Sequence, residues 1–359
     1  MLGMYTTTGS RPIVLISVFL VGTGTHAFAQ GTMSRPTPPT TTRDSSGNLK
    51  TDNPGPPSET LARGLVALAD GSIPEELVEI QSVCGGVPKI IAVADSKGRF
   101  SFNPNVLSDM ADTKGCVLRA SLEGYRSEAK PWSEVNPNSA TKLGKIVLQP
   151  LSSDTNGLTS PTDAQAPKNA KKAYEKGLEE AAKQAWPNAM ASLQKATSAY
   201  PGYSSAWLSL GILQQSDGDR DSAQKSFVQS AQADGKFALP LIRIAALDAA
   251  RADWQATVEQ TQKAIDLNPA AFPHAYELNA IANMNLQKTD AAEKSATEGL
   301  KMDTEHRYPG LEYALGMLLK AKNDRDGVMK HLQAYMDQAP NGQYAAAVKK
   351  ELAQLQAAR

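Results

Sequence analysis

Residues 203–235 read YSSAWLSLGILQQSDGDRDSAQKSFVQSAQADG, and a similar order of small and bulky residues recurs along the second half of the chain. Gly177 and Gly211 lie 34 residues apart, and Pro201 and Pro269 lie 68 residues apart, which is two periods. An interval of this length is typical of helix-turn-helix units that stack into a solenoid. The pattern therefore predicts an all-α array in the C-terminal half of the protein.

The spacing inside each unit resembles that of the tetratricopeptide repeat family. In the second repeat the resemblance is carried by a bulky residue, a Leu-Gly pair, a small residue, an aromatic residue and a turn residue, namely Trp207, Leu210, Gly211, Ala223, Phe227 and Gly235. Related residues occur at matching positions of the first, third and fifth repeats. The resemblance implies five repeats over residues 169–342 and a polar capping helix over residues 343–359.

The fourth repeat departs from the pattern. Over residues 272–305 the Leu-Gly pair is replaced by Leu278-Asn279, and the terminal proline is missing. The interval from Asn279 to the equivalent Gly316 is 37 residues rather than 34, so three extra residues fall in the connection near His306. Because insertions in repeat proteins map to loops, we expect a longer loop here, and a local change of groove curvature is the alternative.

Residues 61–151 have a different character. Short runs that mix apolar and polar residues are separated by glycine-based turns, which predicts several short strands in a small β-sandwich. The run DSKGRFSF (residues 95–102), followed by Leu118-Arg119-Ala120 and Gly124-Tyr125, is similar to the carboxypeptidase regulatory-like family. That resemblance implies a prealbumin-like sandwich without catalytic residues of its own. The predicted fold class is multidomain, α and β, with an N-terminal β-sandwich followed by an all-α tetratricopeptide-type solenoid.

The first 29 residues have the features of an export signal. Arg11 supplies a positive charge, an apolar run follows it, and Ala27-Phe28-Ala29 has the small residues that a signal peptidase requires, so we expect cleavage before Gln30. An uncleaved membrane anchor is the alternative, but the apolar run is shorter than the ~20 residues that span a bilayer. We expect an exported protein, periplasmic or extracellular, without stable membrane insertion after cleavage.

Residues 30–60 and 152–168 are rich in Pro, Thr, Ser and Gly. Segments of this composition have too few large apolar side chains to offset the entropy of ordering. We therefore expect a disordered leader over the first range and a flexible linker over the second.

Both cysteines of the chain, Cys84 and Cys116, fall within the predicted sandwich. Because an exported protein enters an oxidising compartment, we predict a disulfide between them. A redox or metal role is the alternative, but the pair lacks Cys-x-x-Cys spacing and a nearby histidine.

The overall charge balance disfavours two classes of partner. The chain has 37 basic and 37 acidic residues and a formal net charge of zero, so we expect no binding to nucleic acid or to anionic lipid. The sequence also lacks a phosphate-binding glycine loop and an assignable Ser, His and Asp set. We therefore predict a protein that is not an enzyme and that binds no cofactor and no metal.

One zinc-like pattern is an alternative to that prediction. His274 and Glu277 have the His-x-x-Glu spacing of zinc carboxypeptidases. A catalytic zinc site needs a third ligand, and only His306 and His331 are available for that role. Zinc hydrolysis is therefore disfavoured.

The resemblance also implies which side chains line the concave side of the array. Two inward positions from the first helix of each repeat are apolar or aromatic: Tyr174, Leu178, Leu208, Ile212, Ile242, Ala246, Tyr276, Ala280, Tyr313 and Met317. A groove of this kind suits an amphipathic helix or an extended apolar segment of a partner protein or peptide. The alternative is that several of these side chains pack between neighbouring repeats.

The function predicted from the sequence is an exported, non-enzymatic scaffold for protein–protein interaction that binds a partner segment in the solenoid groove. The alternative is a carbohydrate-binding or adhesion protein that acts through the sandwich, with Trp132, Tyr125 and Phe102 as candidate stacking residues. We expect Trp132 to be exposed in a loop and Phe102 to lie in the core.

Overall fold

The computed structural model describes residues 42–43, 49–50, 61–107, 113 and 115–357. The predicted export signal lies outside the described residues. Within the predicted leader, the described residues are two short strands, β1 (Thr42–Arg43) and β2 (Leu49–Lys50), which pair in antiparallel fashion.

Two four-stranded sheets make up the region after residue 60, with strand orders β6-β3-β10-β8 and β5-β4-β7-β9. The strands are β3 (Ala62–Leu68), β4 (Glu79–Cys84), β5 (Val87–Val93), β6 (Arg99–Phe102), β7 (Val117–Ser121), β8 (Tyr125–Ser127), β9 (Lys130–Pro131) and β10 (Thr141–Pro150). β3 and β10 run parallel, and the other strand pairs within the two sheets are antiparallel. The apolar side chains Ile80, Leu118 and Ile146 are fully buried, as expected for the interior of a sandwich.

The candidate stacking residues of the sandwich belong to its interior. Phe102 is 1% exposed, as predicted, and its ring stacks on that of Trp132 with 5.7 Å between ring centroids. The expectation of an exposed Trp132 is wrong, because only 8% of this residue is accessible. Tyr125 is buried as well. A sugar ring therefore cannot stack on these three side chains in this structure, because other side chains already cover their faces.

Eleven helices follow in the described part of the chain: α1 (Lys168–Ala182), α2 (Trp186–Ala199), α3 (Ser204–Ser216), α4 (Arg220–Ala233), α5 (Ala238–Ala250), α6 (Trp254–Leu267), α7 (Pro273–Asn285), α8 (Thr289–Met302), α9 (Gly310–Ala321), α10 (Arg325–Gln338) and α11 (Ala345–Ala357). Consecutive helices pack in pairs, and successive pairs stack in a tetratricopeptide-like array. The predicted fold class, a sandwich followed by an all-α solenoid, is confirmed.

Glycine permits the close crossing of the two helices within a pair. Three glycines each face a large side chain that lies sixteen residues later in the chain (193 − 177 = 16 for the first). The pairs are Gly177 with Leu193, Gly211 with Phe227, and Gly316 with Leu332. A Cβ added to these glycines would lie 2.8, 2.5 and 2.5 Å from the facing side chain. The small-residue positions of the sequence repeat are therefore set by helix packing.

In the fourth pair this apolar contact is replaced by a buried hydrogen-bond network. Asn279 is 2% exposed and accepts a hydrogen bond from the Ser295 hydroxyl, sixteen residues later, at 2.8 Å. Its amide donates to the Thr261 hydroxyl at 2.8 Å, and Asn283 donates to its side-chain oxygen at 2.7 Å. Because these polar atoms are satisfied, the departure from the repeat pattern is accommodated without an unpaired buried amide.

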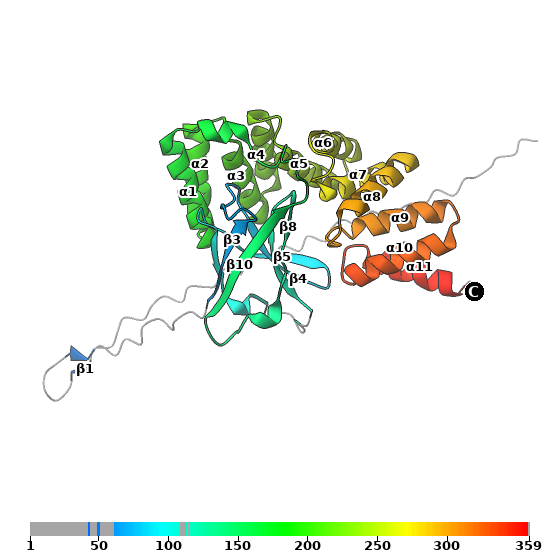
Figure 1. The fold of residues 1–359 in the computed structure, drawn as a ribbon, viewed down its shortest axis with the longest axis horizontal. Coiled ribbons are helices and arrows are strands. Elements are labelled where there is room, and N and C mark those ends of the chain that lie inside the picture. Colours follow the sequence, from blue (N-terminus) through cyan, green and yellow to red (C-terminus); the bar gives the residue numbers. More distant parts are fainter. Residues whose placement is uncertain (1–41, 44–48, 51–60, 108–112, 114, 358–359) are drawn as a thin grey trace, which may run out of the picture.

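Figure 1 shows the array curving around the sandwich, with α1, α3 and α5 above the strands and α9 to α11 to their right. The buried apolar side chains of the sandwich and of helices α1 to α7 form one continuous core. The C-terminal pair and α11 have a separate core that includes Tyr313, Val328 and Leu332.

The predicted flexible linker is packed against the helices. Asn268 at the end of α6 donates hydrogen bonds to the carbonyls of Asp154 and Asn156 at 2.7 and 3.1 Å. Leu158 is 1% exposed and lies in the continuous core. Asp163, in a short 3-10 helix (Pro161–Gln165), accepts a hydrogen bond from the backbone N–H of Ser205 at the start of α3. A free tether was expected from composition, and these tertiary contacts are the physical reason for the difference.

Candidate functional site

The concave side of the array holds the chain's own sandwich. The Tyr174 hydroxyl on α1 donates to the Glu75 carbonyl at 2.7 Å, and Gln184 beyond α1 donates to the Ile91 carbonyl at 3.4 Å. Glycines on the sandwich side also lie against helices, since a Cβ on Gly124 would approach Phe272 to 3.2 Å. The first helices of successive pairs therefore contact the sandwich.

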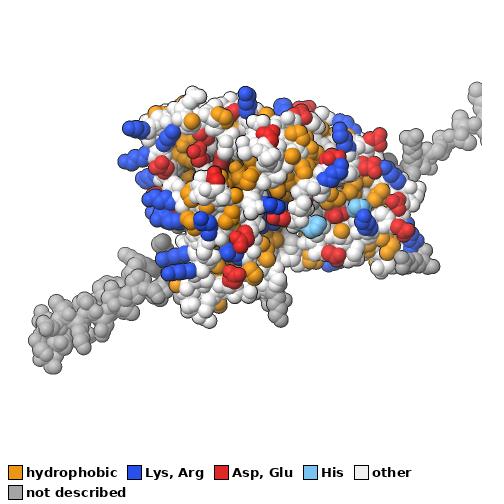
Figure 2. Space-filling model, viewed as in Figure 1, with side chains coloured by type: hydrophobic (Ala, Val, Ile, Leu, Met, Phe, Trp, Pro, Cys, Tyr) orange, Lys and Arg blue, Asp and Glu red, His pale blue; other side chains and the backbone are white. Residues whose placement is uncertain are grey.

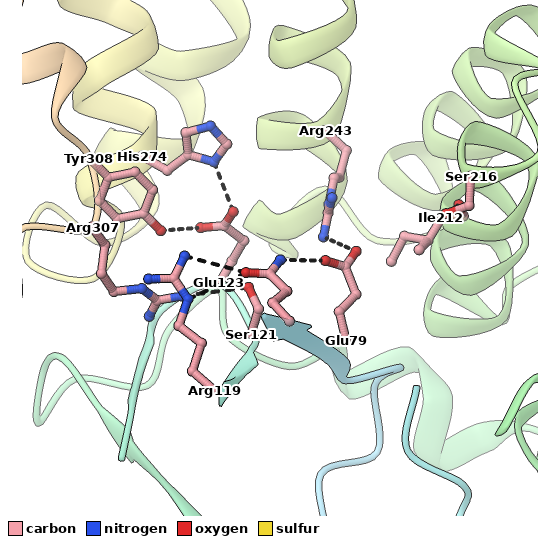
Figure 3. Close-up of polar contacts among 11 residues, drawn as sticks. Glu79, Arg119, Ser121, Glu123, Ile212, Ser216, Arg243, His274, Arg307 and Tyr308 are labelled. Carbon is pink, nitrogen blue, oxygen red and sulfur yellow. Dashed lines mark hydrogen bonds and ion pairs between the residues drawn. The ribbon is translucent and has the colours of Figure 1, made fainter. Parts of the chain in front are cut away.

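We call the contact between the sandwich and the helices the junction. One face of the sheet β5-β4-β7-β9 supplies its polar side chains. The strand register places Glu79 opposite Ser121 and Gln81 opposite Arg119. Residues two apart on a strand point to the same face, so these four side chains form one polar patch, while the alternate residues Ile80 and Ala120 are buried in the core. Figure 3 shows this patch turned toward the helices.

A chain of hydrogen bonds links the patch to α5. The Arg243 guanidinium donates to one carboxylate oxygen of Glu79 at 3.0 Å, and the Gln81 amide donates to the other at 3.0 Å. Arg119 in turn donates to the Gln81 side-chain oxygen at 3.3 Å. Glu79 is only 3% exposed, so its charge depends on Arg243 for compensation.

A second ion pair links the sandwich to α7. His274 and Glu123 are 2.8 Å apart, and the Tyr308 hydroxyl donates to the other Glu123 oxygen at 3.5 Å. Burial alone would raise the pKa of Glu123, but His274 and the nearby arginines lower it to about 2. Burial opposes protonation of His274, and the Glu123 carboxylate outweighs it and raises the pKa of the imidazole.

The three extra residues of the fourth repeat lie in the connection that completes the junction. The segment between α8 and α9 carries Arg307, which donates to the Tyr125 carbonyl at 2.7 Å, and Tyr308, whose ring stacks on His274 with 5.2 Å between centroids. Asp303 holds the segment by accepting hydrogen bonds from the backbone N–H groups of both residues at 2.8 Å. The expected longer loop is present, and it reaches across to the sandwich.

The sequence-based groove includes Tyr174 but none of the charged junction residues, and His274 was considered only as a zinc ligand. Glu79, Gln81 and Arg119 alternate with apolar residues, a pattern that fits a strand with one polar face and does not say what that face contacts. The unusual length of the connection near His306 was the one available signal, and it did not name a partner surface.

The residues predicted to line the groove lie on the first helices of the pairs. Eight of the ten are 9% exposed or less: Tyr174, Leu178, Leu208, Ile212, Ile242, Tyr276, Ala280 and Tyr313. Ala246 and Met317 are half-buried. Tyr174 contacts the sandwich, and Tyr313 stacks on Tyr344 with 3.9 Å between centroids. Ala280 packs with Ala296 and Ala314 of neighbouring helices. In this structure most of these positions are therefore covered, by neighbouring helices or, at Tyr174, by the sandwich.

The array leaves a second apolar groove open on α4, α5 and α6. It has a volume of about 590 Å³, and its apolar lining consists of Val228, Ala231, Leu241, Ile244 and Leu267. Lys263 and Asp266 lie at the same groove. Figure 2 shows apolar side chains gathered over this part of the molecule, among charged ones.

The predicted disulfide is present between Cys84 and Cys116, and no cysteine of the described residues is free. It joins the end of β4 to the segment before β7. The adjacent turn contacts the C-terminal part of the array, because a Cβ on Gly86 would clash with Ala339. The disulfide therefore stabilises a hairpin that itself belongs to the junction.

The His-x-x-Glu pair has structural partners. His274 pairs with Glu123, and Glu277 accepts a hydrogen bond from the Gly310 backbone N–H at 2.8 Å. Burial raises the pKa of Glu277 to about 7. In the described part of the chain, no group of three His, Cys, Asp or Glu side chains is arranged to hold a metal ion.

No model of a known protein family matches the chain, and no curated protein matches it. Among solved structures, the chain is similar to the protein MamA, with 18% identity and a TM-score of 0.42 over 48% of this chain and 92% of that one. It is similar to pilF of Pseudomonas aeruginosa, with 14% identity and a TM-score of 0.45 over 52% and 84% of the two chains. A third likeness is to YrrB, a tetratricopeptide protein with an unusual peptide-binding site, with 16% identity and a TM-score of 0.43 over 50% and 90%.

Likenesses this distant assign no function. The helical region is tetratricopeptide-like by its own geometry, and arrays of this type present extended surfaces for protein contacts and are usually non-catalytic. Within the described residues, no helix combines the length and apolarity that crossing a membrane requires.

Proposed function

We propose that this chain is an exported, non-enzymatic scaffold that binds an apolar segment of a partner protein in a groove of its helical array. The observation that carries the proposal is the open groove on α4, α5 and α6, whose lining combines five apolar side chains with a few polar ones. Such a composition suits a peptide or helix whose apolar side chains enter the groove. The disulfide supports export, because such bonds persist in oxidising compartments.

The N-terminal sandwich has a structural role in this proposal. We propose that it belongs to the carboxypeptidase regulatory-like type and that it supports the array from the concave side. Its contacts with α1, α5 and α7 restrain the curvature of the array. The shape of the groove on α4, α5 and α6 depends on that curvature. A partner that displaced the sandwich would instead bind on the concave side, where Tyr174 contacts the sandwich in this structure.

Site-specific photo-crosslinking in envelope extracts tests the proposal. A photoreactive residue at Val228 reports on the groove on α4, α5 and α6. The matched control is Gln194, which occupies the equivalent position of the preceding repeat, since 228 − 34 = 194. Reporters at Ala246 and Met317, the two half-buried concave positions, detect binding on the other side.

We expect a discrete crosslinked partner from Val228, with loss of the product when Ala231→Glu is added in the same groove. Capture from Ala246 or Met317 alone would transfer the partner site to the concave face. Absence of a discrete product at all three positions would overturn the scaffold function.

A further inference from the structure

Among the described residues, two guanidinium groups at the junction have no carboxylate bound directly to them. Arg119 and Arg307 lie side by side in Figure 3, one on β7 and the other in the connection between α8 and α9. Arg119 donates to the Gln81 amide oxygen at 3.3 Å, and Arg307 donates to the Tyr125 carbonyl at 2.7 Å, both neutral acceptors. In the described part of the chain neither residue forms an ion pair, whereas Arg243 in the same network is paired with Glu79.

One N–H donor of these two arginines also lacks a hydrogen bond among the described residues. The Arg307 Nε–H is buried and has no hydrogen-bond partner among the described residues. Burial, and next the charge of Arg307, lower the pKa of Arg119 to about 10, so the two cations destabilise each other. Buried charges in folded proteins are normally compensated by an opposite charge.

Nearby carboxylates are already engaged. Glu123 is paired with His274, and both Asp303 oxygens accept backbone N–H groups of the connection. Glu305 is exposed and acts on Arg119 through its charge, without an ion pair between them. The described residues therefore leave the two guanidinium groups without a directly bound anion.

We propose that Arg119 and Arg307 form a binding site for an oxyanion, a carboxylate or phosphate group, at the junction of the sandwich and the helical array. A guanidinium presents a planar fork of N–H donors that matches the oxygens of such groups. The Ser121 hydroxyl, 3.5 Å from the Arg307 guanidinium and on the same face of β7 as Arg119, lies beside the site as a further donor.

The side chains of the site are partly exposed, and they lie where binding would affect both domains. Arg119, Ser121 and Arg307 are half-buried rather than sealed in the core. Because one arginine belongs to the sandwich and the other to the array, a shared anion would join the two domains and stabilise the folded form by mass action.

The experiment uses the full chain and measures binding of sodium phosphate and, separately, sodium acetate by calorimetry and thermal unfolding at constant ionic strength, with sodium chloride as reference. The variants are Arg119→Gln and Arg307→Gln, and the control is Arg251→Gln, an exposed arginine paired with Asp221. We expect saturable binding that weakens at least about tenfold in either variant and is unchanged in the control.

The two anions distinguish the source of the oxyanion, since preference for acetate indicates a carboxylate and preference for phosphate indicates a phosphoryl group. A second readout needs no substitution: the Nε–H resonance of Arg307 in the unmodified protein shifts on titration with the bound anion. If neither anion binds more strongly than chloride, or if binding survives both substitutions, the proposal is wrong.

Discussion

Contacts inside the repeats and contacts between the sandwich and the repeats use different chemistry. Inside a pair such as α3 and α4, Gly211 lies against the ring of Phe227. At the junction, beside the continuous apolar core, Glu79 forms an ion pair with Arg243 and Glu123 forms one with His274. The first kind joins residues sixteen apart, and the second joins residues 164 and 151 apart. The array is therefore specified by contacts that are local in sequence, while its attachment to the sandwich is specified by paired charges.

The largest expected effect concerns the buried pair of the junction. Arg243→Met leaves the Glu79 carboxylate without its cation, so we expect the free energy of unfolding to fall by about 3–5 kcal/mol. The double variant Arg243→Met with Glu79→Gln removes both charges and should recover a large part of that loss. Chemical denaturation of the four proteins measures the coupling. An additive result would show that the pair does not hold the junction together.

Removal of the disulfide comes next. With 116 − 84 + 1 = 33 residues in the closed loop, Cys84→Ala with Cys116→Ala should lower the free energy of unfolding by about 3–4 kcal/mol. Because the adjacent hairpin contacts Ala339, we expect hydrogen exchange to increase both in the sandwich and at the end of α10. An increase confined to the sandwich would show that the hairpin is not coupled to the array.

A smaller effect tests the packing inside the repeats. Gly211→Ala places a Cβ about 2.5 Å from the Phe227 ring, and we expect a loss of about 1–3 kcal/mol from overpacking. The matched control is Gly235→Ala, because an added Cβ there meets nothing within 4 Å. Thermal unfolding of the two variants separates crowding from the general effect of replacing glycine. Equal behaviour of both variants would contradict the packing explanation of the repeat.

The smallest expected effect is the pH dependence of the second ion pair. The lowered pKa of Glu123 makes its contribution to stability available above about pH 4.5, and this contribution is lost as the pH falls through about 2. The raised pKa of His274 makes its contribution available below its unfolded value of about 6.5, and this contribution is lost as the pH rises through the folded pKa.

A double-mutant cycle with His274→Gln and Glu123→Gln should therefore show stronger coupling at about pH 5.5 than at about pH 8.5. The expected difference is about 1 kcal/mol, the excess of a charge-assisted over a neutral hydrogen bond. Coupling that is the same at both values would mean that the imidazole does not change its charge in this range.

The connection after the fourth repeat shows what a repeat pattern can predict and what it cannot. The excess length near His306 was visible in the sequence, and a longer loop is what the structure has. That the loop carries Arg307 and Tyr308 to the sandwich was not visible, because a one-dimensional period contains no information on what the concave side faces.

The two fold types, the helix pairs and the disulfide could be predicted from the amino-acid sequence. Periodicity and small-residue spacing reflect contacts between residues close in the chain, and two cysteines in an exported protein allow one pairing. Three features became visible only in the folded structure: the sandwich lies on the concave side, the linker is packed, and the polar face of β4 and β7 is turned toward helices. The physical reason is that polar residues such as Glu79 and Arg119 suit water and a charged partner equally well, so their sequence pattern does not distinguish an exposed face from a domain junction.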